Sequence, residues 1–247
     1  MQDYQPRPNL LADRIVLVTG AAEGVGHAVA RACAAHGATV ILSGFDEKRL
    51  ETVYDEIESN GDPQPASLPL DLETADEQLY LGIASTIGDE FGRLDGLVHC
   101  ATFVPFLSRI DDYDAREWER VIRINLTAPF LLTQSCMPLL RAAEDASVVF
   151  TSDRVGRNGL AYWGAYAAAK FGIEGLMQTL AEETRDNSNI RVNSLDPGIV
   201  RTAQRRQLYP GEDPNTLPTP KSIAPAYLWL LGDDSRGTTG EALNAQG

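Results

Sequence analysis

Several features are scarce in this chain of 247 residues, and each scarcity argues against a class of protein. Its three cysteines, Cys33, Cys100 and Cys136, are scattered singly and are odd in number. We therefore expect buried thiols in a reducing compartment, and no disulfide framework. The three histidines show no ligand spacing with these cysteines, so no metal site is expected.

Long apolar runs and basic residues are also few. No run of eighteen apolar residues occurs, so we expect no membrane span. The first eight residues lack the apolar core of a secretory signal, which favours a cytoplasmic protein. The chain carries 21 basic and 35 acidic residues, a formal net charge of −14. This balance argues against nucleic-acid binding, which requires a basic surface.

Short β-branched apolar runs alternate with helical stretches along the whole chain. Because such runs do not alternate with polar residues, they are typical of parallel strands buried on both faces. We expect strands near residues 14–19, 39–43, 66–70, 97–100, 147–152, 190–195 and 241–245. We expect helices between them, including long ones over 115–141 and 163–185. Pro129 and Pro138 should bend or interrupt the first of these two helices.

This alternation predicts one α/β domain over residues 1–247. Right-handed crossovers then give a doubly wound, Rossmann-type fold, with a mainly parallel seven-stranded sheet and helices on both faces. Residues 1–13 are interpreted as a short polar arm. Residues 202–220 are polar and rich in proline, and we interpret them as a flap on the substrate side with no regular structure.

A glycine-rich loop, Gly-Ala-Ala-Glu-Gly-Val-Gly, follows the first strand and opens the first helix, the context that a dinucleotide-binding fingerprint requires. Gly20 would permit the tight turn, Gly24 would let the backbone approach a pyrophosphate, and Gly26 would let helix and strand pack closely. The amides of Gly24 and Val25 would point at the phosphates. The alternative is a turn that only joins strand to helix.

Tyr166 and Lys170 lie four residues apart, which places both on one face of the expected helix. Small residues surround them. A lysine ammonium nearby would lower the tyrosine pKa from its usual value of about 10, so that the phenol exchanges a proton with an alcohol or ketone near neutral pH. Because this spacing is common, an ordinary amphipathic helix is the alternative.

Together, the Gly-x-x-x-Gly-x-Gly loop and a Tyr-x-x-x-Lys motif about 140 residues later resemble the short-chain dehydrogenase/reductase family, over roughly residues 10–245. Residues 151–170 and 228–235 further resemble a bacterial subgroup of uncharacterised oxidoreductases. The resemblance implies an NAD(P)-dependent oxidoreductase that interconverts a secondary alcohol and a carbonyl of a small molecule. It also implies a homodimer or homotetramer in which the two long helices pair across a two-fold axis.

The resemblance also implies four catalytic residues. Tyr166 would be the general acid/base, Lys170 would tune it and bind the nicotinamide ribose, and Asn125 would hold a water of the proton relay. A family serine lies thirteen or so residues before the tyrosine, where this chain has Asp153, preceded by Ser152. Because a carboxylate would repel a developing alkoxide, we assign the role to Ser152, shifted by one residue. The alternative is that Ser152 merely ends its strand.

The cofactor NAD or NADP would lie along the glycine loop and the ends of the strands. The residues expected to bind it are Gly20, Ala22, Glu23, Gly24, Val25, Gly26, Phe45, Asp71, Leu72, Cys100, Ala101, Tyr166, Lys170, Pro197, Val200 and Thr202. Glu23 would repel the 2′-phosphate of NADP, and Lys48 or Arg49 could reach that phosphate only if their loop turned back, which favours NAD slightly.

The segment His99-Cys100-Ala101-Thr102 departs from the family's Asn-Asn-Ala-Gly. Either cofactor binding is weakened or the loop is rebuilt. The rival hypothesis is therefore a non-catalytic dinucleotide-binding protein that kept the fold. A sugar epimerase is disfavoured because 247 residues leave no room for its substrate domain. An enoyl reductase is disfavoured because that branch spaces its tyrosine and lysine more widely.

Overall fold

The computed structural model describes residue 1 and residues 4–246, and it is built around a seven-stranded sheet. The strand order is β3-β2-β1-β4-β5-β6-β7, and every neighbouring pair is parallel. The strands are β1 Ile15–Thr19, β2 Thr39–Gly44, β3 Ala66–Pro69, β4 Gly96–His99, β5 Ala146–Thr151, β6 Ile190–Asp196 and β7 Ala242–Asn244. The predicted doubly wound α/β fold is confirmed.

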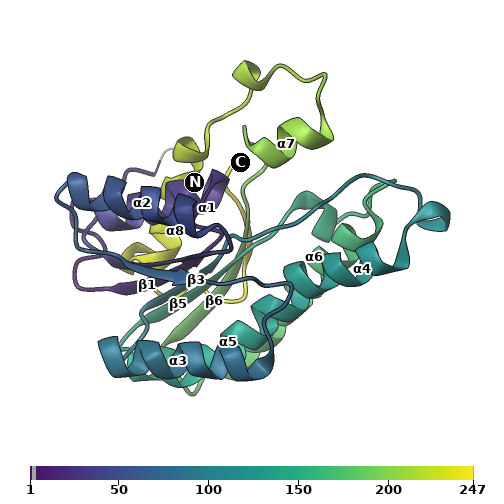
Figure 1. Ribbon diagram of the computed structural model, residues 1–247. Coiled ribbons are helices and arrows are strands. Elements are labelled where there is room, and N and C mark those ends of the chain that lie inside the picture. Colours follow the sequence, from purple (N-terminus) through teal and green to yellow (C-terminus); the bar gives the residue numbers. More distant parts are fainter. Residues whose placement is uncertain (2–3, 247) are drawn as a thin grey trace.

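Helices cover both faces of the sheet (Figure 1). Helices α1 Gly24–Ala35, α2 Glu47–Ser59 and α8 Pro220–Leu231 lie on one face, and α3 Glu77–Phe91, α5 Ala128–Ala142 and α6 Gly164–Thr184 lie on the other. Helix α4 Ala115–Ile122 packs on α6. None of the helices in the described part of the chain is both long and apolar enough to cross a membrane.

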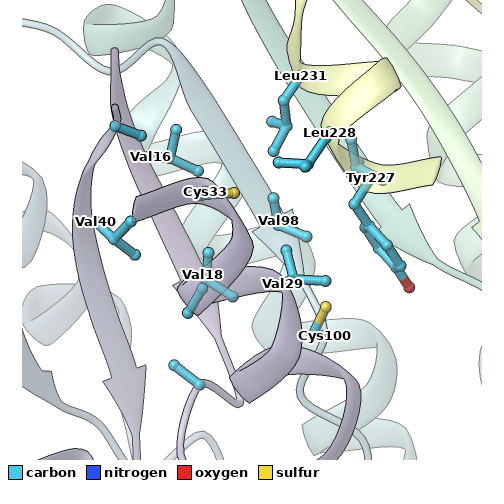
Figure 2. Packing of buried hydrophobic residues seen from close by; sticks show 14 of the residues in the cluster. Val16, Val18, Val29, Cys33, Val40, Val98, Cys100, Tyr227, Leu228 and Leu231 are labelled. Atoms are coloured by element: carbon cyan, nitrogen blue, oxygen red, sulfur yellow. The ribbon is translucent and has the colours of Figure 1, made fainter. Parts of the chain in front are cut away.

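The β-branched residues of the central strands are buried on both faces, as their unalternating sequence predicts. Val16 and Val18 of β1 pack under α1 and α8, beside Val98 of β4 (Figure 2). Leu17, between the two valines, packs on the opposite face among residues of α3 and α5. Because apolar burial contributes about 25 cal/mol per Å², this two-sided core holds β1 and β4 firmly in place.

The order of the strands reverses at β1. The chain passes from β1 through α1 to β2 on one side, and from β3 through α3 to β4 on the other. Ligands of open α/β sheets bind in the crevice outside the carboxyl ends of the strands at such a point. The glycine loop after β1 and the segment after β4 therefore meet at the expected binding crevice.

The helix expected over residues 115–141 is interrupted, directly before the first of its two prolines. A π-helical turn, Arg123–Thr127, separates α4 from α5. Pro129 lies in the first turn of α5, where a missing amide costs little, and Pro138 lies inside α5 without dividing it. Asn125 is at the centre of the π turn, a kind of insertion that is frequent at functional sites.

Two further expectations need correction. Residues 202–220 are not without regular structure, because they contain helix α7 Ala203–Leu208 and a short 3-10 turn, Pro214–Thr216. The arm over residues 1–13, interpreted as polar, contains Leu10 and Leu11, which are 4% and 0% exposed and pack into the core on the α1 and α8 face.

Candidate active site

The glycine loop allows an approach that a side chain would block. Gly20 has φ +67°, and a Cβ there would lie 2.8 Å from the backbone of Ala101. A Cβ on Gly26 would lie 2.2 Å from the carbonyl oxygen of Gly20. The loop thus closes against both the segment after β4 and the start of α1. The amides at the N-terminus of α1, which begins at Gly24, are the anion-binding groups that a pyrophosphate requires.

Side-chain hydrogen bonds hold the segment after β4 in place. The Ala101 amide donates to Oγ1 of Thr19 at 3.2 Å, which ties the segment to the end of β1. The Cys100 sulfur lies 3.4 Å from Oγ1 of Thr151, and burial raises the pKa of this thiol to about 11. The segment that departs from the family's Asn-Asn-Ala-Gly is therefore held by side-chain hydrogen bonds, with a neutral thiol packed beneath it.

Asn125 holds the next part of this segment. Its Nδ2 donates to the carbonyl oxygens of Phe103 and Val121, each at 2.8 Å. Its Oδ1 accepts from the Phe103 amide at 2.9 Å and from the Thr102 hydroxyl at 3.0 Å. The side chain is 1% exposed and makes every bond that an amide can make. Its position and orientation are therefore tightly fixed.

Tyr166 and Lys170 meet this network from α6. The Tyr166 hydroxyl lies 3.4 Å from Oγ1 of Thr102. The Lys170 ammonium lies 5.4 Å from the centre of the Tyr166 ring and donates to the Thr151 carbonyl at 2.7 Å. Thr102 follows Ala101, which packs against Gly20, so the phenol stands at the crevice mouth beside the glycine loop. The structure brings together three of the four predicted catalytic residues, Asn125, Tyr166 and Lys170.

The electrostatics of this pair differ from the expectation. Burial raises the pKa of Tyr166 above its usual range, and the Asp153 carboxylate raises it further, whereas the hydrogen bond from Thr102 lowers it. Burial also lowers the pKa of Lys170 to about 8, against the opposing charges of Asp153 and Asp196. The side chains of this protein therefore favour a neutral phenol, and Lys170 keeps most of its charge at pH 7.

Ser152 is placed away from the phenol. Its hydroxyl donates to Oε1 of Glu174 at 2.6 Å, inside a buried cluster in which Arg157 and Ser194 also bind Glu174. Asp153 is extended, with φ −158° and ψ 152°, so its side chain points to the other side of the chain from that of Ser152. The Asp153 carboxylate, rather than Ser152, acts on Tyr166, because its negative charge raises the pKa of the phenol.

The residues predicted at the adenosine end are exposed. Phe45, just after β2, is 79% exposed, and the exposed Asp71 accepts from the Glu73 amide and the Thr74 hydroxyl. Leu72 is partly buried, as are Ala22 and Val25 in the glycine loop. The guanidinium of Arg49 turns back to Glu23 at 2.5 Å, an arrangement that the sequence left open.

The segment after β6 closes the other side of the crevice. A Cβ on Gly24 would lie 3.5 Å from Cγ2 of Thr202, which also caps α7. Val200 is buried, and the Pro197 carbonyl accepts from Gln246 at 2.8 Å. A pocket of about 310 Å³ opens beside this segment. It is lined by Arg154, Arg157, Asn158, Asp196, Gly198, Asn244 and Gln246.

His99, which ends β4, is a buried packing residue. The His99 ring stacks on Phe150 with centroids 4.8 Å apart, and its Nε2 lies 2.8 Å from the Thr133 hydroxyl. Burial lowers its pKa to about 3, which makes it a neutral packing residue. Among the residues that the structure describes, no group of three or more histidine, cysteine and acidic side chains is arranged to hold a metal ion.

Comparison with known proteins agrees with this geometry. The family model for short chain dehydrogenases matches residues 14–213, which is most of the chain. The chain belongs to the short-chain dehydrogenase/reductase family. The E. coli K12 protein YciK, described as an uncharacterized oxidoreductase, is 45% identical to this short-chain dehydrogenase, over 98% of this chain and 96% of YciK.

Two further relatives bear on the cofactor and the reaction. A short chain dehydrogenase from Shigella flexneri 2a str. 301, solved in complex with NADP, is 44% identical, with a TM-score of 0.95 over 98% of this chain and 100% of that one. The trans-4-hydroxycyclohexanecarboxylate dehydrogenase of Sinomonas cyclohexanicum is 32% identical, over 96% of this chain and 93% of the relative. The NADP complex does not support the slight preference for NAD inferred from the sequence.

Sequence reasoning assigns no role to two residues that act on the phenol of this short-chain dehydrogenase, Thr102 by a hydrogen bond and Asp153 by its charge. Thr102 was noted only as a departure from the family glycine, and Asp153 was set aside in favour of Ser152. The signal for Asp153 was present, because it stands at the family's usual spacing from Tyr166. No sequence signal could reveal that Ser152 is held by Glu174, because the contact depends on how β5 packs on α6.

Proposed function

We propose that this protein is an NAD(P)-dependent oxidoreductase that interconverts a secondary alcohol and a carbonyl, with Tyr166 as the general acid/base. The observation that carries the proposal is the position of the Tyr166 hydroxyl at the crevice mouth. It contacts Thr102, whose neighbour Ala101 packs against Gly20. The family membership and the name of the Sinomonas dehydrogenase, which acts on a hydroxy acid, support the same reaction class.

The residues of the crevice fit a dinucleotide. Gly20 and Gly26 let the loop pack closely at the start of α1, whose amides can bind a pyrophosphate, and Thr202 stands opposite Gly24. When bound, the nicotinamide would donate or accept the hydride at carbon. Tyr166 would then give a proton to the carbonyl oxygen, or take one from the alcohol, while Lys170 would bind the ribose and Asn125 would hold the Thr102–Phe103 segment in place.

We do not propose that Ser152 binds the substrate oxygen, because its hydroxyl donates to Glu174. The remaining cofactor residues, including Phe45, Asp71, Leu72, Cys100, Pro197 and Val200, would line the rest of the crevice. The substrate is proposed to be a small molecule, and α7 with the turn after it is proposed to act as the substrate-side flap.

Tyr166→Phe tests the proposed reaction. A panel of secondary alcohols that includes trans-4-hydroxycyclohexanecarboxylate and cyclohexanol, and of their ketones, is assayed by NADPH and NADH absorbance. We expect the variant to lose turnover by about 10²-fold to 10⁴-fold, while calorimetry gives unchanged cofactor affinity. Turnover equal to that of the parent would refute the role of Tyr166.

A second candidate function is a dinucleotide-binding protein that does no chemistry. One observation favours it: burial and Asp153 raise the pKa of Tyr166, which weakens the phenol as an acid/base. Binding of NADPH or NADH with no turnover of any substrate in the panel would support this candidate. Activity that depends on Tyr166 would exclude it.

We also propose a homodimer or homotetramer. Three large apolar side chains on the helices expected at the interface are exposed: Trp118 of α4 by 37%, Phe130 of α5 by 42% and Phe171 of α6 by 48%. Burying them against a second copy would remove apolar surface from water. We expect light scattering to give a multiple of 26.9 kDa, and a Phe171→Glu variant to give a smaller species. A parent mass of 26.9 kDa would contradict the proposal.

A further inference from the structure

The Thr102 hydroxyl lies between two oxygens that differ in their ability to donate a hydrogen bond. It is 3.0 Å from Oδ1 of Asn125 and 3.4 Å from the Tyr166 hydroxyl. An amide oxygen can only accept, whereas a phenol donates and a phenolate accepts. Thr102 is itself exposed at the crevice mouth, so its hydroxyl can turn freely about its Cβ–Oγ1 bond.

A hydroxyl carries one proton and two lone pairs, so it serves only one acceptor at a time. While Tyr166 is a phenol, the Thr102 proton can go to Oδ1 of Asn125, the nearer of the two oxygens at 3.0 Å. Once Tyr166 has lost its proton, the Thr102 proton can turn to the phenolate. Asn125 loses one donor but keeps the Phe103 amide at 2.9 Å, so its oxygen is not left unpaired.

The other groups that face the phenol cannot make this exchange. Asp153, at the start of the turn after β5, and Asp196, at the end of β6, act on Tyr166 as negative charges and disfavour its phenolate. An ionised carboxylate can only accept a hydrogen bond. Lys170, on α6 itself, donates a hydrogen bond to the Thr151 carbonyl, and its ammonium lies 5.4 Å from the centre of the phenol ring. Ser152 is committed to Glu174.

We propose that Thr102 is a positioning residue for the reaction, because its hydroxyl donates to Asn125 while Tyr166 is a phenol and turns to donate to Tyr166 once it is a phenolate. The proposal rests on the proposed function of Tyr166. It assigns a task to a side chain at a position where the related family has a glycine, which offers no hydroxyl.

The experiment compares Thr102→Val, which keeps the branched shape and removes the hydroxyl, with Thr102→Ser, which keeps the hydroxyl. Alcohol oxidation requires the phenolate, so its rate falls as the pH drops below the pKa of Tyr166. Without the donor from Thr102 the phenolate is less stable, and this acid limb moves to higher pH. We expect a shift of about one pH unit in Thr102→Val, with about tenfold lower kcat below the limb and an unchanged KM. Thr102→Ser should match the parent.

The parent and Tyr166→Phe are measured first. If Tyr166→Phe is as active as the parent, the proposed function fails and this proposal falls with it. If Tyr166 is required but Thr102→Val keeps the parent's acid limb and kcat, only the role of Thr102 is overturned. Melting temperature and NADPH affinity show whether Thr102→Val is intact. Should it not fold, Thr102→Gly, the family's own residue, is expected to give the same shift, and a parental profile in that variant overturns the proposal.

Discussion

The two ends of the crevice are built in opposite ways. At the Tyr166 end, Asn125 is 1% exposed and Lys170 is 3% exposed, and both side chains are fixed by hydrogen bonds to backbone groups. At the adenosine end, Phe45 is 79% exposed, and Arg49 pairs with Glu23 across side chains that are each 57% exposed. The first end is set before any ligand arrives, and the second can rearrange at little cost.

This difference follows from solvation. A buried polar group that loses its partner costs about 1 to 3 kcal/mol, because water cannot replace the bond. An exposed ion pair contributes about 0 to 1 kcal/mol, because water competes for both charges. Substitutions at the Tyr166 end should therefore change stability and rate, whereas substitutions at the adenosine end should change only which cofactor is preferred.

Asn125→Ala should have the largest effect on the folded state. It removes the partner of three backbone groups on Phe103 and Val121, and of the Thr102 hydroxyl. We expect the free energy of unfolding to fall by about 3 kcal/mol, measured by urea denaturation. Asn187→Ala is the matched control, because its exposed Nδ2 donates to a single carbonyl, and it should change stability by less than about 0.5 kcal/mol. If both variants lose the same free energy of unfolding, the buried hydrogen bonds of Asn125 stabilise the fold no more than one exposed hydrogen bond does.

Asp153→Ser should shift the pH dependence of alcohol oxidation. The Asp153 charge raises the pKa of Tyr166, so removing the carboxylate lowers that pKa. The phenolate then forms at lower pH, and the acid limb of the rate should move down by about one pH unit. Ser152→Ala, at the neighbouring position, is the control and should leave the limb in place, since its hydroxyl serves Glu174. If the acid limb also moves in Ser152→Ala, Ser152 rather than Asp153 would be the residue that contacts the substrate oxygen.

The sequence predicts features that depend on one local segment, and it does not predict contacts between segments. Val16, Val18 and Val98 predicted buried strands because burial on both faces leaves an unalternating pattern, and the spacing of Tyr166 and Lys170 predicted their common face. These are properties of one local segment. By comparison, the direction of Ser152 and the charge around Tyr166 depend on residues that other elements bring to them, and no local pattern records such contacts.

The same reasoning explains two misjudged segments. Helix α7 is short and polar, so its sequence has no apolar period, although the Thr202 hydroxyl caps it by accepting from the Arg205 amide. The division of the helix over residues 115–141 was assigned to prolines, which are visible in any sequence. The structure places the interruption at the π turn around Asn125, whose side-chain amide donates to the Val121 carbonyl and so takes part in the turn's own hydrogen bonding.

The smallest expected effect is at the exposed end, where Arg49 offers a positive charge beside the end of β2. To meet the 2′-phosphate of NADP, its guanidinium would have to leave Glu23, which at this exposure costs no more than about 1 kcal/mol. We expect Arg49→Ala to lower the affinity for NADPH relative to NADH by about threefold to tenfold, and Glu23→Gln to raise it, both measured by calorimetry. Lys48→Ala, the neighbouring cation on α2, should leave the ratio unchanged. If Arg49→Ala leaves the ratio of NADPH to NADH affinity unchanged while Lys48→Ala changes it, Lys48 is the cation that binds the 2′-phosphate. The pairing of Arg49 with Glu23 would then have no part in cofactor choice.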